Sequence, residues 1–82
     1  ILTGARAIAA RYPSDAAVLS ALAEAEYDAG NDAEAIAAAD KALALDPRQV
    51  NAYVQKGFAM FRQAQDADNR EAAFAAAMQP FE

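Results

Sequence analysis

The chain has 82 residues, an Ala-rich composition that is 56% hydrophobic, and a formal net charge of −5 at pH 7. This negative charge opposes binding to the phosphates of nucleic acids and to anionic lipid surfaces. The sequence contains neither Cys nor His, which excludes disulfides, thiol nucleophiles and imidazole chemistry and therefore disfavours an enzyme.

Residues 1–82 read as one small domain, which starts with Ile1 inside a helix-like segment. We therefore expect a part of a longer protein, and the Ala-rich composition favours a bacterial one. No apolar run approaches the roughly 18 residues of a membrane span, and no signal-peptide pattern is present. The composition favours neither the cytoplasm nor the periplasm. No cofactor motif or metal site is predicted, because Asp66, Asp68 and Asn69 lack the Gly and the closing Glu of a calcium loop.

The first two predicted helices are separated by a turn around Pro13. Residues 2–11 are interpreted as the end of a preceding helix. Ser14 or Asp15 can then cap a helix that runs to about residue 29. We expect this helix to end where Gly30 supplies the left-handed backbone conformation.

The same kinds of signal predict two more helices. Asn31 and Glu34 have the spacing of a capping box and predict a helix to about residue 45. Asp46 and Pro47 predict the next start, with Pro at the first helical position, where its missing N–H group is not needed. That helix is expected to end near Gln65.

A last helix is predicted at the end of the chain. Asp68 and Glu71 repeat the capping-box spacing, and Pro80 ends the segment. The predicted loops are only a few residues long, so consecutive helices must lie antiparallel. No segment has the alternation of a strand. The sequence therefore predicts an all-α protein of about five helices.

Pro13 and Pro47 stand 34 residues apart, and other positions repeat at the same distance. The matched pairs are Leu19 with Tyr53, Ala23 with Gly57, Ala25 with Ala59, and Tyr27 with Phe61. The small residues among them allow helices to approach closely. The spaces between the helices are expected to be filled by Leu22, Ile36, Leu43 and Leu45.

A resemblance to one complete tetratricopeptide repeat, a 34-residue helix–turn–helix unit, covers residues 16–49, which read AAVLSALAEAEYDAGNDAEAIAAADKALALDPRQ. The positions that match the family pattern are Leu19, Leu22, Ala23, Gly30, Ala35, Ala39 and the Asp46-Pro47 pair. Residues 1–13 resemble the end of an earlier repeat, and residues 50–82 a second, irregular one. The resemblance implies repeats stacked as a short right-handed superhelix, an α-solenoid.

Three departures from the family pattern stand out. Glu26 occupies the place of the family's Tyr, and Lys56 that of its Leu. Their stems can lie along apolar surface while the charged ends reach water. After Ala64 the family spacing fails, because the turn Gly is missing and residues 65–69 intervene. The last helix is therefore predicted from its cap alone.

The resemblance also implies a concave peptide-binding groove lined by the first helix of each repeat. Carried over position by position, its residues are Ser20, Glu24, Tyr27 and Asp28, then Val54, Phe58, Phe61 and Arg62. Their spacing places each set on one helix face. Tyr27, Phe58 and Phe61 are expected to form an apolar floor, and Glu24 and Asp28 to bind basic or amide groups. Alternatively, Phe58 and Phe61 are core residues packed against the last helix.

The sequence thus predicts a protein-interaction scaffold that binds a peptide or protein segment carrying basic and apolar groups, without a catalytic residue. A clamp for a partner's C-terminal carboxylate is not expected, because Arg62 is the only cation on the predicted groove face. Two alternatives remain open. One is a homodimer formed through Phe74, Met78 and Phe81 at the irregular end. The other is a non-catalytic accessory segment of a larger enzyme.

Overall fold

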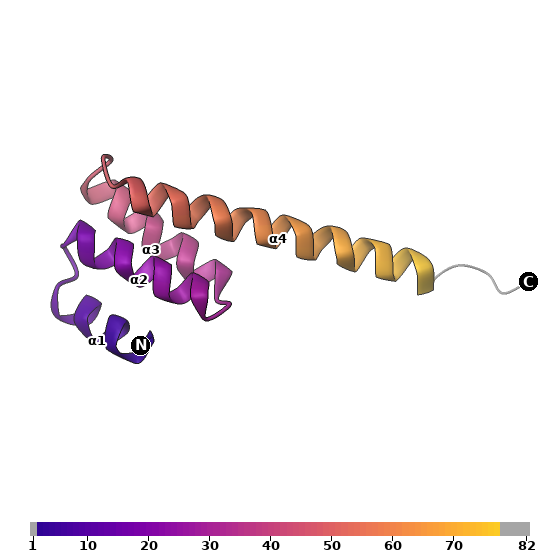
Figure 1. The fold of residues 1–82 in the computed structure, drawn as a ribbon, viewed down its shortest axis with the longest axis horizontal. Coiled ribbons are helices and arrows are strands. Elements are labelled where there is room, and N and C mark those ends of the chain that lie inside the picture. The colour runs from indigo at the N-terminus through magenta and orange to yellow at the C-terminus, as the bar shows by residue number, and fades with distance from the viewer. Residues whose placement is uncertain (1, 78–82) are drawn as a thin grey trace, which may run out of the picture.

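The computed structural model describes the backbone of residues 2–77 and the side chains of residues 2–71. This part of the chain contains four helices and no strand: α1 (Leu2–Arg11), α2 (Ala16–Asp28), α3 (Asp32–Leu45) and α4 (Val50–Ala77) (Figure 1). The all-α prediction is therefore confirmed. The predicted end signal Pro80, and Met78 and Phe81 of the predicted dimer contact, lie outside the described residues.

The predicted start and stop signals of α2, Asp15 and Gly30, are confirmed. The carboxylate of Asp15 accepts hydrogen bonds from the backbone N–H groups of Ala17 (3.0 Å) and Val18 (3.2 Å), two of the donors that a helix start leaves free. At the other end, Gly30 has a φ of +87°. This left-handed conformation costs glycine little, so the chain can reverse direction and begin α3 two residues later.

The predicted start of α3 at Asn31 is confirmed but its capping hydrogen bond is not, and the predicted start of α4 is wrong. Asn31 stands before α3, but its side chain makes no capping hydrogen bond and instead donates to Glu26 in α2. Pro47 lies in a turn and not at a first helical position, because α4 begins at Val50. Asp46 holds this turn by accepting a hydrogen bond from the backbone N–H of Arg48 (3.0 Å).

The predicted break after Gln65 is also wrong, because α4 is one continuous helix of 28 residues. Ala64 stands 34 residues after Gly30, and a left-handed Ala costs roughly 1–2 kcal/mol. The helix therefore continues where α2 stopped, and the described chain has four helices and not five. Residues 63–71 are exposed along their whole length, and this half of α4 projects away from the other helices (Figure 1). Among the described helices none is long and apolar enough to cross a lipid bilayer.

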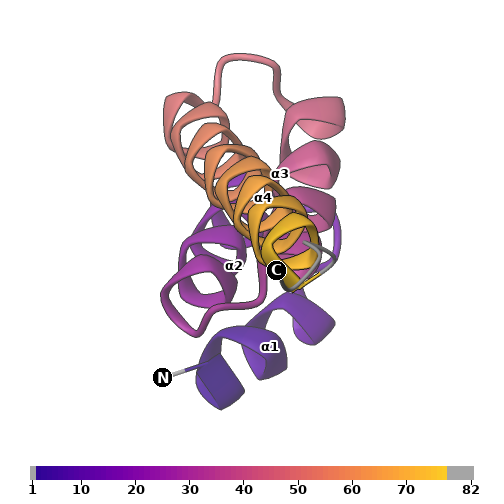
Figure 2. The same ribbon diagram turned by 90° about the vertical axis from the view of Figure 1, so that its right-hand side faces the viewer.

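The central element is α2, which packs against all three other helices, most extensively against α3. α1 contacts α2 alone and lies on its far side from α4 (Figures 1 and 2). The core consists almost entirely of alanine; its cluster comprises Ala9, Leu19, Ala23, Ala38, Ala39, Ala42 and Ala52. Leu22 and Leu43 pack against this cluster as predicted, whereas Leu45 (48% exposed) and Gly57 lie at the surface.

The alanine core predicts a strong sensitivity to side-chain volume. Ala39 is fully buried, so Ala39→Leu should lower the free energy of unfolding by about 1–3 kcal/mol, because the added atoms separate closely packed helices. Urea unfolding followed by circular dichroism measures this change. Ala37→Leu, at an exposed position of the same helix, is the matched control. Equal effects of the two substitutions would contradict the close-packed core.

Candidate peptide-binding surface

The contact between α2 and α4 is bridged by side-chain hydrogen bonds that involve two of the predicted groove residues. The side-chain amide of Asn51 donates to the Ser20 hydroxyl (3.1 Å), and that of Gln55 donates to the Glu24 carboxylate (3.4 Å). Ser20 is only 2% exposed. It therefore lies between the two helices and not on an open surface.

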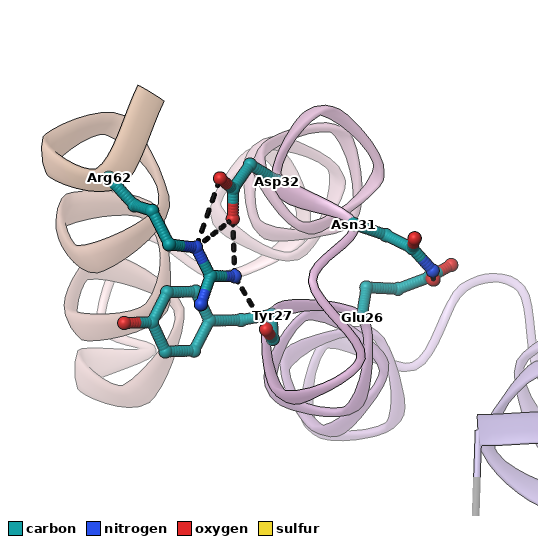
Figure 3. Close-up of polar contacts among 5 residues, drawn as sticks. All are labelled: Glu26, Tyr27, Asn31, Asp32 and Arg62. Atoms are coloured by element: carbon teal, nitrogen blue, oxygen red, sulfur yellow. Dashed lines mark hydrogen bonds and ion pairs between the residues drawn. The ribbon is translucent and has the colours of Figure 1, made fainter. Parts of the chain in front are cut away.

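Arg62 of α4 links the last turn of α2 to the start of α3. Its Nε donates to both carboxylate oxygens of Asp32 (2.9 and 3.1 Å), and one Nη donates to the backbone carbonyl of Tyr27 (2.6 Å) (Figure 3). The guanidinium also lies 4.0 Å from the centre of the Tyr27 ring, which in turn lies 5.7 Å from that of Phe58. The hydrogen bonds to Asp32 raise the pKa of Arg62.

The position of Arg62 therefore gives it a structural task. It neutralises Asp32 in the first turn of α3 and binds a carbonyl in the last turn of α2, where a cation also interacts favourably with the helix dipole. Sequence reasoning placed Arg62 on the groove face but missed Asp32, its partner. The two are 30 residues apart, and no local pattern links them.

The bidentate and stacked geometry predicts that Lys cannot replace Arg62. Arg62→Lys should lower the melting temperature, because an ammonium group cannot pair with Asp32 through a planar fork and stack on Tyr27 at once. Thermal unfolding by circular dichroism is the measurement. Arg48→Lys is the control, since the Arg48 side chain is 91% exposed. Identical melting temperatures for both variants would contradict the structural role of Arg62.

On the other side of the α2–α3 turn, Glu26 is buried and has two partners, of which Figure 3 shows Asn31. Arg6 of α1 donates to its two carboxylate oxygens (2.9 and 3.2 Å), and Asn31 donates to one of them (2.9 Å). The hydrogen bond from Arg6 is the main reason why the pKa of Glu26 lies below its ordinary value of 4.5; the bond from Asn31 adds to it, and burial opposes it. We expected the carboxylate of Glu26 to extend to water. Instead it is buried and forms an ion pair with Arg6. The other departure, Lys56, pairs with Asp40 of α3 (2.7 Å).

The lowered pKa of Glu26 predicts acid sensitivity. Because the folded state binds this proton less readily than the unfolded chain, the stabilisation is complete above about pH 4.5 and is lost as the pH falls through the folded-state pKa. Glu26→Gln should lower stability at pH 7 and flatten its decline in acid. Urea unfolding at a series of pH values tests this. Glu34→Gln, at an exposed position of α3, should keep the decline of the wild type.

A groove of about 550 Å³ lies between α1 and α2. Its lining is mostly apolar and consists of Gly4, Ala5 and Ile8 from α1, and Ala17, Val18, Ala21, Glu24, Ala25 and Asp28 from α2. Glu24 and Asp28, both exposed and both predicted groove residues, are its acidic members. The residues of α1 were not predicted.

The predicted apolar floor, Tyr27, Phe58 and Phe61, does not line this groove. Val54, Phe58 and Phe61 lie on α4 and are 40%, 50% and 65% exposed. Phe58 contacts Tyr27, and neither Phe58 nor Phe61 is a core residue in the described part of the chain. The eight predicted residues are therefore divided among three places: the groove, the α2–α4 contact and the open face of α4.

The groove lining has a counterpart elsewhere in the molecule. At a distance of 34 residues, Gly4, Ala5 and Ile8 correspond to Ala38, Ala39 and Ala42, the core residues of α3. The lining residues of α2 correspond in the same way to residues of α4, among them Asn51, Gln55, Phe58 and Arg62, which contact α2 directly. The groove residues of α1 and α2 thus correspond, in the same order, to the residues of α3 and α4 that pack against α2. This correspondence was the signal that could have found the residues of α1.

Comparison of the chain with protein-family models, with curated proteins and with solved structures found no match in any of the three. Within the described residues no group of three or more acidic side chains is arranged to hold a metal ion. The groove and the open face of α4 are therefore interpreted from their own chemistry.

Proposed function

We propose that the chain is a tetratricopeptide-like repeat module that binds an α-helix of a partner protein in the groove between α1 and α2. The observation that carries this proposal is the correspondence between the groove lining and the residues that hold α2. The helix bounds support the same 34-residue stride: α2 and α4 begin at Ala16 and Val50, and α1 and α3 end at Arg11 and Leu45. Because α1 and α2 correspond to α3 and α4, a helix that lies in the groove would correspond to α2.

The lining defines the chemistry of the occupant. Small side chains on both walls allow a helix to approach closely, so the occupant presents small apolar residues along one face, as α2 does. In α2, Tyr27 contacts Phe58 and Arg62. The corresponding groove residues are Glu24 and Asp28, so the occupant places a basic residue where α2 has Tyr27. A binding role also agrees with a sequence that has no Cys and no His.

A peptide with the sequence of residues 14–30 and Arg in the place of Tyr27 is the direct probe. It should bind the intact chain with fast exchange and shift the amide resonances of Ala17, Ala21 and Ala25 in an NMR titration. The same peptide with Glu in that place should bind about 2- to 5-fold more weakly, the range of an exposed ion pair.

Two variants of the chain complete this test. Ala21→Glu places a carboxylate in the groove and should abolish binding of the Arg peptide. Ala37→Glu, at an exposed position of α3 outside the groove, adds the same charge and should leave binding unchanged. Equal affinities of the two variants, or a peptide that shifts no groove resonance, would contradict the proposal.

A further inference from the structure

The first half of α4 carries an exposed apolar stripe centred on Gly57. Each helical residue advances by about 100°, so the residues three, four and seven positions from Gly57 in either direction lie within about 60° of it. The buried residues Ala52, Gln55 and Ala59 lie on the opposite side of the helix. The large members of the stripe are between 40% and 72% exposed. Around Gly57, the stripe consists of Val50, Tyr53, Val54, Met60, Phe61 and Ala64.

The stripe is free of charge. Lys56 and Arg62, the charged residues between positions 50 and 64, lie outside it, and both pair with acidic residues of α3. The whole segment between Asp46 and Asp66 has no acidic residue, although the net charge of the chain is −5. A surface that covers the stripe therefore encloses no unpaired charge, and an apolar surface fits it best.

The centre of the stripe is a glycine that nothing in the described part of the chain requires. Gly57 is exposed and has no positive φ, and a Cβ atom added to it would meet no atom within 4 Å. Glycine inside a helix is less favourable than alanine, but it allows another backbone to approach closely. Gly57 therefore marks the point where a helix from outside can cross α4.

The stripe is self-complementary. In both directions from Gly57, apolar residues stand at the same distances. They are Val54 and Met60 at three residues, Tyr53 and Phe61 at four, and Val50 and Ala64 at seven. A two-fold axis at Gly57 therefore sets each apolar position of α4 against an apolar position of an identical, antiparallel helix. This is the pattern that the shared interface of a symmetric dimer needs.

We infer that the stripe is covered by the same stripe of a second copy of the chain. The two α4 helices lie antiparallel and cross at Gly57. Tyr53 of each copy then lies beside Met60 of the other, and Val54 beside Phe61. The pairing uses one face of α4, opposite the face that contacts α2 and α3. It leaves the groove between α1 and α2 open and does not depend on its occupant.

Charges at both ends of the stripe agree with this pairing. Asp68 continues the line of the stripe by one turn beyond Ala64. Arg48 stands two residues before the start of α4, and its side chain is 91% exposed. Asp68 lies 11 residues after Gly57 and Arg48 lies 9 before it, so the antiparallel pair brings them level. Each copy thus places an acidic residue beside a basic residue of the other, twice by symmetry.

The size of the stripe predicts a weak dimer. Tyr53 and Phe61 are 54% and 65% exposed. An aromatic side chain buries roughly 150–250 Å² when it is fully covered, so each of the two offers roughly 100 Å². With its smaller members, the stripe buries a few hundred Å² per copy, less than the roughly 800 Å² of a standard interface. We therefore expect a dissociation constant in the micromolar range.

Sedimentation equilibrium with substitutions at the crossing point is the first test. The mean mass should rise from 8.6 kDa toward twice that value, over a series from about 10 μM to 1 mM. Gly57→Leu adds apolar area but separates the crossing helices, so it should weaken the dimer about 10-fold. The same variant should keep or raise the melting temperature of the dilute monomer, because its new side chain meets open space. Gln63→Leu, exposed on α4 outside the stripe, should leave the dissociation constant unchanged.

Charge reversal tests the antiparallel register. Arg48→Glu or Asp68→Arg alone should weaken the dimer about 4- to 25-fold, because each breaks two symmetry-related pairs of about 2- to 5-fold. The double variant Arg48→Glu, Asp68→Arg should restore the affinity of the wild type. Equal weakening in the double variant would contradict this register.

Spin-label distances identify the direction of the two helices. The chain has no Cys, so one introduced Cys carries the only label of each copy. At the helical rise of 1.5 Å per residue, labels at Gln63→Cys should lie about 20 Å apart and labels at Arg70→Cys about 40 Å apart. Equal distances at the two positions indicate parallel helices. That result, a wild-type chain that stays at 8.6 kDa, or a Gly57→Leu variant that associates more tightly would overturn the inference.

Discussion

The structure depends on helices that approach closely enough for alanine to form a core. A buried alanine removes little apolar area from water, so each contact contributes little unless the backbones themselves come near. Ala23, Ala35, Ala39 and Ala42 are fully buried, and no large side chain in the described part of the chain is. Orientation therefore relies on polar links between helices, chiefly Arg6 with Glu26 and Arg62 with Asp32. Each link joins an outer helix to the α2–α3 hairpin and fixes the spacing that the alanines require.

A single backbone conformation decides whether two helical segments form a hairpin or one rod. At Gly30 the chain reverses, and the buried faces of α2 and α3 meet. At Ala64 the helix continues, so the segments that correspond to α2 and α3 form one rod and do not pack on each other. The penalty for a left-handed alanine is only about 1–2 kcal/mol, so the long helix reflects a local preference and not a loss of the packing pattern. Ala72, Ala73 and Ala76, one stride after the buried Ala38, Ala39 and Ala42 of α3, keep the small residues of that pattern.

Most of the fold followed from local signals in the sequence, because caps and left-handed glycines act within a few residues. Asp15 and Gly30 behaved as predicted, and the 34-residue stride located the start of α4 to within a few residues. The Asn31 side chain did not cap α3, because it is turned toward Glu26, to which its amide nitrogen donates and which also pairs with Arg6 of another helix. The surface was harder to predict. Helical spacing grouped Ser20 with Glu24 and Asp28 on one helix, and Arg62 with Phe58 on another. It could not tell which part of each face a neighbouring helix covers.

The two open surfaces are not complementary to each other, although the stride would allow copies to stack end to end. In such a stack, α4 of one copy would occupy the groove between α1 and α2 of the next, and Phe61 would take the place that Tyr27 has against α4. Phe61 would then cover Glu24 and Asp28 without offering a cation, and enclosing unpaired carboxylates costs several kcal/mol. An open stack of this kind would also have no natural end. The acidic residues of the groove thus disfavour this stacking and agree with the basic helix that we propose as its occupant.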